Sequence, residues 1–189
     1  MEAEFFTVFP EMKTDRFILR EIEQKDAPEL FHYFSKDEVT QYYDLDTFTE
    51  LSQAKGLIAS MAERFDQKIG IRWGIADKRT NKIIGSAGFH NWVKEHYKAE
   101  LGFEVTPEYW RQGVMTEVLP FILSYGFKEM TLHRIEAMYD PENTASKATL
   151  FKQGFTFEGI LRQASFEKGR FCDAAVCSLL KSEWRQTEY

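Results

Sequence analysis

The chain has 189 residues, the size of one domain of ordinary length. Its net charge is −6, from 30 acidic and 24 basic residues, and no Lys- or Arg-rich run offers the basic surface that nucleic-acid binding requires. Apolar residues make up 43% of the sequence, enough for a packed core, but no stretch of roughly eighteen apolar residues could span a membrane.

The cysteine and histidine spacing favours neither a disulfide nor a metal site. Cys172 and Cys177 fall on one expected strand and point to opposite faces, so they cannot pair locally. The four histidines are scattered, without C-x-x-C or H-x-x-x-H spacing. The acidic start, Met1–Glu4, lacks the features of a secretory signal. We therefore expect a cytoplasmic protein without a metal, and a single domain over residues 1–189, since no repeat or linker divides the chain.

The first third of the chain is expected to form one strand and two helices. Arg16–Glu21 is a short β-rich run. Asp26, Pro28 and Glu29 then supply helix-start chemistry: an N-cap, a first-turn Pro and an acid that closes a capping box. A second helix is expected to start near Thr47–Glu50. Its apolar stripe has helical spacing and consists of Leu51, Ala54, Ile58, Met61 and Phe65.

From Gly70 onward, the hydrophobic pattern predicts strands that alternate with helices. The expected strands are Ile71–Asp77, Lys82–Asn91, Tyr97–Val105, His133–Tyr139, Phe155–Phe166 and Phe171–Leu180. In the third, apolar and other residues alternate with a period of two from Ala99 to Val105, and the last two are expected to form a hairpin across Glu167–Arg170. The expected helices are Val114–Met130, which contains Pro120, and Asn143–Gln153, which Gly154 ends. This order predicts an α/β fold with a mixed sheet, and not a doubly wound parallel one.

The segment Trp110-Arg111-Gln112-Gly113-Val114-Met115 joins a strand to a helix. The first N–H groups of a helix lack intrahelical partners and lie at the positive end of its dipole. Gly113 has no Cβ, so an anion such as a diphosphate can approach the backbone closely. These arguments leave two interpretations, an anion site or an ordinary turn. The sequence has neither G-x-x-x-x-G-K-[ST] nor G-x-G-x-x-G after a strand, which disfavours a nucleotide hydrolase or a dehydrogenase.

The same segment, extended to Pro107–Glu117, resembles the pyrophosphate loop of the GNAT acetyltransferase superfamily, whose pattern is [Q/R]-x-x-G-x-[G/A]. It is most similar to the ribosomal-protein-alanine N-acetyltransferase (RimJ/RimL-like) branch. Three further segments resemble that branch in the same order: Thr14–Arg20, Asp140–Ser146 with Gly154-Phe155, and Cys177–Trp184. The resemblance implies a GNAT fold, with a mixed and mostly antiparallel sheet of about seven strands flanked by about four helices.

The resemblance also implies a function. It points to an N-acetyltransferase that moves an acetyl group from acetyl-CoA to a primary amine, the α-amine of a protein N-terminus, by direct transfer in a ternary complex. The pantetheine would lie along the Leu101–Val105 strand, on the backbone N–H groups of Phe103 and Val105. Asn143 would either hydrogen-bond the pantetheine or cap its helix. The residues expected at the diphosphate are Arg111, Gln112, Gly113, Val114, Met115 and Thr116.

The sequence departs from the family pattern in three places. Trp110 and Met115 replace the Gln/Arg and Gly/Ala of the loop, so we expect backbone N–H groups to hold the diphosphate. Pro120 falls inside a helix, at a cost of about 3 kcal/mol unless the helix kinks. Leu150 stands where many members carry a Tyr that protonates the leaving thiolate, so that Tyr cannot be the acid here.

Several side chains are candidates for the remaining chemistry, each with a purely structural alternative. Glu100 is the candidate base, acting through a water with its pKa raised by desolvation; the alternative is an ion-paired or solvated strand residue. Ser146 is the candidate acid or thiol-stabilising group, or else a hydroxyl that satisfies first-turn N–H groups. Tyr139 and His90 are weaker candidates that could simply pack. The residues that would line the acceptor wall or fill the core are Tyr42, Tyr43 and Trp73.

Two other functions stay open at this stage. One is an acetyltransferase for a small amine, such as an antibiotic, a polyamine or an amino acid, in the same fold. The other is an acyl-CoA-binding module without catalysis, which the missing Tyr at position 150 leaves possible. The acidic net charge suits a cationic acceptor, whether this is a protein N-terminus or a small amine. The sequence also leaves the oligomeric state open, including a homodimer.

Overall fold

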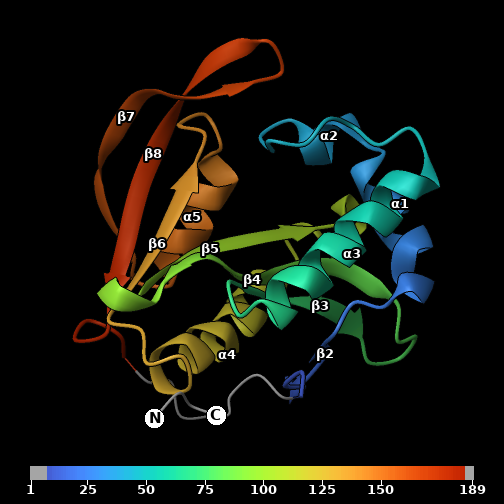
Figure 1. Ribbon diagram of the computed structural model, residues 1–189, viewed down its shortest axis with the longest axis horizontal. Coiled ribbons are helices and arrows are strands. Elements are labelled where there is room, and N and C mark those ends of the chain that lie inside the picture. Colours follow the sequence, from blue (N-terminus) through green and yellow to red (C-terminus); the bar gives the residue numbers. More distant parts are fainter. Residues whose placement is uncertain (1–7, 186–189) are drawn as a thin grey trace.

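The computed structural model describes residues 8–185, and within that range the chain forms one eight-stranded sheet (Figure 1). The strand order is β1-β2-β3-β4-β5-β6-β8-β7, and every neighbouring pair is antiparallel except β5 and β6. The strands are β1 Met12–Lys13, β2 Phe17–Arg20, β3 Ile71–Asp77, β4 Ile83–Val93, β5 Lys98–Val105, β6 Arg134–Tyr139, β7 Thr156–Glu167 and β8 Arg170–Leu180. The expected mixed, mostly antiparallel sheet is confirmed. The two-residue β1 was not expected, because two residues are too few to show an alternating pattern.

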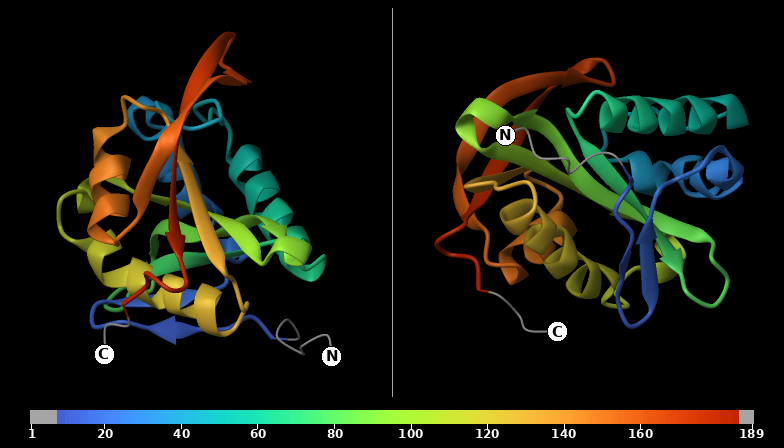
Figure 2. Two further views of the ribbon diagram at one scale, coloured as in Figure 1. Left: turned by 90° about the vertical axis from the view of Figure 1, so that its left-hand side faces the viewer. Right: turned by 60° about the horizontal axis from the view of Figure 1, so that its bottom comes forward.

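Five α-helices accompany the sheet in the described part of the chain: α1 Ala27–Phe34, α2 Asp37–Thr40, α3 Leu51–Asp66, α4 Val114–Lys128 and α5 Thr144–Lys152. Four were expected, and the one-turn α2 is the addition. The sheet runs between α1 and α3 on one face and α4 on the other (Figure 2). None of the helices in residues 8–185 is long and apolar enough to cross a membrane.

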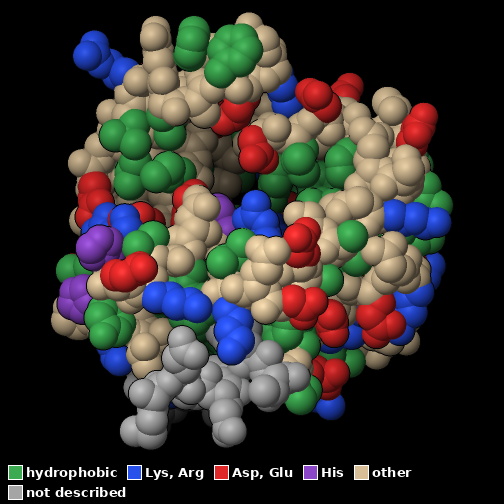
Figure 3. All heavy atoms as spheres, in the orientation of Figure 1, with side chains coloured by type: hydrophobic (Ala, Val, Ile, Leu, Met, Phe, Trp, Pro, Cys, Tyr) green, Lys and Arg blue, Asp and Glu red, His purple; other side chains and the backbone are tan. Residues whose placement is uncertain are grey.

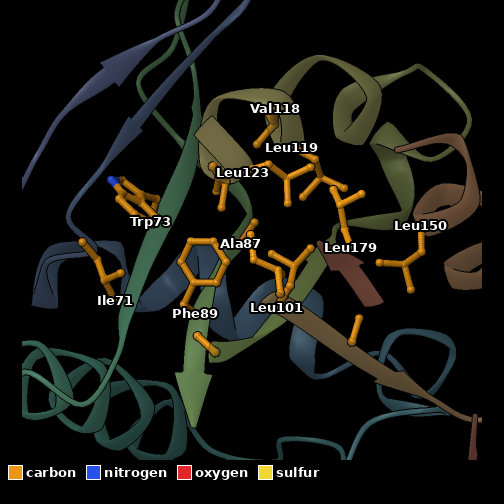
Figure 4. Close-up of a cluster of buried hydrophobic side chains, with 14 of the residues drawn as sticks. Ile71, Trp73, Ala87, Phe89, Leu101, Val118, Leu119, Leu123, Leu150 and Leu179 are labelled. Atoms are coloured by element: carbon orange, nitrogen blue, oxygen red, sulfur yellow. The ribbon is translucent and has the colours of Figure 1, made fainter. Parts of the chain in front are cut away.

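Each face of the sheet has its own hydrophobic core. The core beneath α4 and α5 joins Trp73, Phe89 and Leu101 of the sheet to Leu119 and Leu150 of the helices (Figure 4). The core beneath α1 and α3 includes Leu30, Phe34, Ala54, Ile58, Ala76 and Ile83. Burying each such large apolar side chain stabilises the fold by about 1.5–3 kcal/mol. The alternation predicted for β5 follows from this arrangement, because odd-numbered residues enter the α4 core and even-numbered residues face the α1 side.

Two local expectations, for Asp26 and Leu51, are wrong, and the alternative left open for Trp73 is decided in favour of the core. Asp26 precedes α1 but does not cap it, because its carboxylate binds the two terminal nitrogens of Arg20 at 2.8 Å and the backbone N–H of Glu23 at 2.9 Å. A charge-assisted bidentate pair is stronger than a neutral cap. Leu51 is 39% exposed, since the apolar stripe of α3 enters the core only one turn later. Trp73 is fully buried in the α4 core, so it cannot line an acceptor site.

Two other local expectations are confirmed. α5 ends as predicted at Gly154, whose φ is +90°; its N–H donates to the carbonyl of Phe151 and the N–H of Phe155 donates to that of Leu150. This pair of hydrogen bonds is the Schellman motif. β7 and β8 meet as predicted in a tight hairpin, whose central Lys168 and Gly169 both have positive φ. α4 continues as one helix through Pro120.

Candidate active site

The one parallel pair of strands separates part of the way along its length. β5 pairs with β6 at Lys98↔Arg134, Ala99↔Ile135 and Glu100↔Glu136, and the pairing ends there. Beyond it, β5 continues as Leu101–Val105 beside β4, and β6 continues as Ala137–Tyr139 beside β8. Figure 1 shows the two strands diverging. We call the space between these two segments the split; within residues 8–185 it leaves one edge of β5 without a neighbouring strand.

The parity of β5 decides which backbone groups face the split. The N–H of Thr106 donates to the carbonyl of Ile84 at 2.8 Å, so the backbone N–H and C=O groups of even-numbered residues in this segment point to β4. Backbone groups alternate along a strand, and therefore the N–H groups of Phe103 and Val105 point into the split. The indole N–H of Trp110 donates to the carbonyl of Val105 at 2.6 Å. Trp110 thus closes the end of this open edge.

The split leads into the turn that follows β5, Trp110–Met115, which we call the anion turn. Arg111 and Gly113 have φ of +59° and +75°, and Gln112 between them has a negative φ. Alternating handedness of this kind turns successive N–H groups toward one side and forms an anion-binding concavity. Gly113 is the N-cap of α4 and has no side chain to accept from the first-turn N–H groups. The side chain of Gln112 is tied back to the carbonyl of Glu108 at 2.7 Å.

Glu100 lies at the point where the strands separate. Its carboxylate is 3.4 Å from Nε2 of His90 and accepts a 3.0 Å hydrogen bond from Nδ2 of Asn91. Both partners lie at an irregularity in β4, where Asn91 has a φ of +48°. Bulges often re-aim side chains beside active sites, and this one directs two donors at one carboxylate.

The expectation that the pKa of Glu100 is raised is wrong. Burial of the carboxylate acts in that direction, but the hydrogen bond and charge of His90, the hydrogen bond from Asn91 and the charge of Lys98 outweigh it. The pKa of Glu100 therefore lies below its ordinary value of 4.5. The sequence did not reveal this, because His90 faces Glu100 through the register of β4 on β5 and Asn91 reaches it through the irregular end of β4.

A row of polar side chains continues along the same face of β5, and the sequence did not predict it. A Cβ at Gly102 would lie 3.0 Å from Nη1 of Arg72 and 3.3 Å from Cε1 of His90. The missing side chain at position 102 therefore leaves the room that these two groups occupy. Arg72 connects this space to Glu104, with which it forms a buried ion pair. The one sequence signal was the even-numbered position of Glu104, on the same face as Glu100.

Glu104 ties β5 to α1 and to the segment that follows α2. It is 7% exposed and accepts hydrogen bonds from the hydroxyl groups of Tyr33, at 3.2 Å, and Tyr43, at 2.7 Å. The Tyr43 hydroxyl also accepts from Nη2 of Arg72 at 2.8 Å, and burial raises the pKa of Tyr43. Tyr43 therefore anchors the segment between α2 and α3 to β5. Its expected place at the acceptor wall stays a hypothesis, as does that of Tyr42, which is half-buried.

The other candidate residues lie at the far side of the split, where β6 leads into α5. Asn143 caps α5, because its Oδ1 accepts the N–H of Ser146 at 3.0 Å. Ser146 is half-buried in the first turn of this helix. Leu150 is 1% exposed and fills the core, and Tyr139 is 8% exposed at the end of β6. Asn143 and Ser146 are thus half-buried, whereas Leu150 and Tyr139 are buried.

The tip of the β7–β8 hairpin reaches α2. The ammonium group of Lys168 at the hairpin tip donates to the backbone carbonyl of Thr40 in α2. The surface is hollowed between β6 and α2, and acidic side chains stand at the rim (Figure 3). The residues that line the hollow between α2 and the hairpin tip are Asp37, Glu38, Thr40, Gln41, Asp46, Thr47 and Lys168.

Comparison with known proteins identifies the family. Residues 16–156 match the acetyltransferase (GNAT) domain. The N-acetyltransferase YoaA of Bacillus subtilis (strain 168) is 43% identical over 174 residues, which cover 92% of this chain and 98% of YoaA. The ribosomal protein uS5-alanine N-acetyltransferase of Escherichia coli (strain K12) is 25% identical over 178 residues, 92% of either chain. A solved GNAT-family acetyltransferase from Bacillus anthracis is 27% identical with a TM-score of 0.81, covering 92% of this chain and 100% of that one. This chain therefore belongs to the GNAT acetyltransferase family and is an acyltransferase.

Proposed function

We propose that the protein transfers the acetyl group of acetyl-CoA to the α-amine of a protein N-terminus, by direct transfer in a ternary complex. The observation that carries this proposal is the open edge of β5 beside the anion turn. An extended pantetheine arm can accept hydrogen bonds from the N–H groups of Phe103 and Val105 like an added strand. Its diphosphate then meets the N–H groups at the start of α4.

The diphosphate is held by the backbone from Arg111 to Thr116. This assignment follows from two features of the turn. The side chain of Gln112 is occupied by the Glu108 carbonyl, and Gly113 lets an anion reach the N–H groups without meeting a Cβ. Met115 and Thr116 contribute through their N–H groups in the first turn of α4. Asn143 caps α5, and that hydrogen bond leaves its amide group free to donate to the pantetheine.

Glu100 and Ser146 carry the proton transfers. Glu100 accepts a proton from the acceptor amine through a water, and His90 and Asn91 hold its carboxylate in place. The amine nitrogen then bonds to the thioester carbonyl carbon, and the carbon–sulfur bond breaks. Ser146 donates a hydrogen bond to the departing thiolate and relays to it the second proton that the nitrogen loses as the amide forms, so CoA leaves as the thiol. A strand N–H beside the split stabilises the oxyanion.

The acceptor is proposed from two observations. The E. coli relative that covers 92% of this chain is named for the N-terminal alanine of a ribosomal protein. The acidic side chains that line the hollow at the hairpin tip, Asp37, Glu38 and Asp46, attract a cationic acceptor. Both fit a flexible, positively charged N-terminal peptide.

The test separates binding from turnover and then one acceptor class from another. Acetyl-CoA binding is measured by isothermal titration calorimetry, and thiol release is measured with ribosomal-protein N-terminal peptides, with the same peptides blocked at the α-amine, and with small amines. The proposal expects binding and faster release with the free peptides. Turnover with small amines alone would refute the proposed peptide acceptor. Binding of acetyl-CoA without turnover of any acceptor would indicate a binding module. An absence of acetyl-CoA binding would refute the proposal as a whole.

A further inference from the structure

Two sequence segments that lie about a hundred positions apart meet beside the anion turn. Both oxygens of the Glu117 carboxylate, in the first turn of α4, accept hydrogen bonds from Arg16, before β2: Oε1 from the backbone N–H at 2.7 Å and Oε2 from Nε at 2.6 Å. The Thr14 hydroxyl donates to the same carboxylate at 2.5 Å. Three donors from one turn thus fix a single acid at the start of the helix.

Arg16 also holds the anion turn itself. Its Nη1 donates to the carbonyl of Gln112 at 3.1 Å, and its Nη2 lies 3.8 Å from where a Cβ on Gly113 would be. The guanidinium is stacked on the Phe17 ring, 4.9 Å from the centroid, so its position is constrained. A trans peptide places its N–H opposite its carbonyl. The hydrogen bond from Arg16 to the Gln112 carbonyl therefore directs the N–H of Gly113, in the same peptide, away from Arg16 and to the outside of the turn.

Glu117 presents an electrostatic problem for anion binding. It lies one helical turn from Gly113, since its N–H donates to the Gly113 carbonyl at 3.1 Å. A carboxylate there repels a diphosphate bound at the N-terminus of α4. The Glu117 side chain is only 18% exposed, so water screens it poorly, while the Arg16 side chain is 48% exposed. The positive charge of Arg16 offsets this repulsion.

We propose that Arg16 is a positioning residue for the diphosphate of acetyl-CoA, which it serves by orienting the Gln112–Gly113 peptide and by neutralising Glu117. This inference rests on the proposed function, because it needs acetyl-CoA at the anion turn. A neutralising role for Arg16 and a purely structural ion pair predict opposite effects on acetyl-CoA binding when Glu117 is also removed. If the pair only stabilised the fold, loss of either partner would weaken binding. If Arg16 neutralises Glu117, removal of the acid relieves the damage caused by loss of the base.

The test measures the Kd for acetyl-CoA by calorimetry in wild type, Arg16→Gln, Glu117→Gln and the double variant, each checked for folding by thermal unfolding. Arg16→Gln is expected to raise the Kd for acetyl-CoA roughly tenfold, because the variant loses one charge-assisted contact at the anion turn. The double variant is expected to bind more tightly than Arg16→Gln alone. Lys13→Gln is the matched control, because it removes the same charge from the β1–β2 hairpin at a side chain that is 64% exposed; its Kd should equal that of wild type.

The changes in the Kd for acetyl-CoA either support the role of Arg16 or refute it. An increase of at least about fivefold in Arg16→Gln, partly reversed in the double variant, supports the inference. A smaller increase, or a double variant that binds no more tightly than Arg16→Gln, overturns it. Should Arg16→Gln not fold, Arg16→Lys replaces it; that variant keeps the charge but cannot reach Glu117 and Gln112 together, so about a threefold weaker affinity is expected and wild-type affinity would refute positioning. If wild type itself does not bind acetyl-CoA, the proposed function fails, whatever the variants do.

Discussion

Nε2 of His90 lies 3.4 Å from Oε1 of Glu100, at the point where β5 and β6 stop pairing. The side chains are 30% and 15% exposed, so this contact is largely shielded from water. It keeps the Glu100 carboxylate in a fixed position and in its charged form. A proton acceptor at the start of an open strand edge is what amide formation from a thioester needs.

Glu100→Gln should lower kcat roughly 10² to 10⁴-fold, the usual contribution of a positioned general base. The KM for acetyl-CoA should change little, because the proposed cofactor contacts are backbone groups farther along β5. Initial rates with a peptide acceptor measure both constants. Glu95→Gln serves as the control, since Glu95 is exposed in the turn before β5. An unchanged kcat in Glu100→Gln would remove this residue as the base.

His90→Gln should move the acid limb of the pH–kcat profile to higher pH. The pKa of Glu100 is below 4.5 in the wild type, so its carboxylate stays charged until the pH falls below that ordinary value. Loss of His90 removes the strongest of the effects that lower this pKa, and Glu100 then takes up its proton at a higher pH. The corresponding stabilisation of the fold, present above the unfolded-state pKa and lost as pH falls through the folded-state pKa, should shrink as well. A limb that does not move would show that another group controls it.

Ser146→Ala and Asn143→Ala should have different effects, although the two residues are three positions apart. Asn143 caps α5, and its loss should reduce the free energy of unfolding by about 1 kcal/mol. Ser146 contributes its backbone N–H to that cap, so its replacement by Ala leaves the cap intact and should lower kcat alone. Chemical denaturation and steady-state rates distinguish the two. A normal kcat in Ser146→Ala would assign the hydroxyl a structural role only.

Arg72→Met should destabilise the protein by about 3–5 kcal/mol, because it leaves the Glu104 carboxylate buried without its ion-pair partner. The double variant Arg72→Met/Glu104→Leu should recover a large part of that loss, since two apolar groups of similar size can replace a buried ion pair. Urea unfolding measures both. A loss below about 1 kcal/mol in Arg72→Met would show that the ion pair with Glu104 contributes little to stability.

Local patterns in the sequence predicted most of the fold. The alternation of β5 and the glycine that ends α5 depend on neighbouring residues, and both were predicted correctly. β1 and α2 were missed because two and four residues are too short to show a period. Asp26 was misassigned because its Arg20 partner lies on the strand before it, and an ion pair with that strand outcompeted the local cap.

The candidate site depends more on contacts between distant parts of the chain. The turn at residues 110–115 is local, so the sequence could indicate it. The open edge of β5 depends on where β6 stops pairing with it, and the sequence pointed to that strand only through the family resemblance. The partners of Glu100 come from β4, and those of Glu104 include groups from β3, from α1 and from the segment after α2. Their contacts depend on strand register, on helix packing and on the irregularity near Asn91. The contact of Arg16 with Glu117 joins two motifs that the sequence shows only separately. Which groups meet, and how they shift a pKa, follows from tertiary structure alone.

We propose that acetyl-CoA pairs with the open edge of β5 and with the anion turn. Amide hydrogen exchange of the ¹⁵N-labelled protein, followed by NMR with and without saturating acetyl-CoA, tests it most directly. The N–H groups of Phe103, Val105 and Gly113 should exchange more slowly in the complex. That of Thr106, already bonded to Ile84, should change little. Binding that leaves the exchange of Phe103, Val105 and Gly113 unchanged would contradict the account.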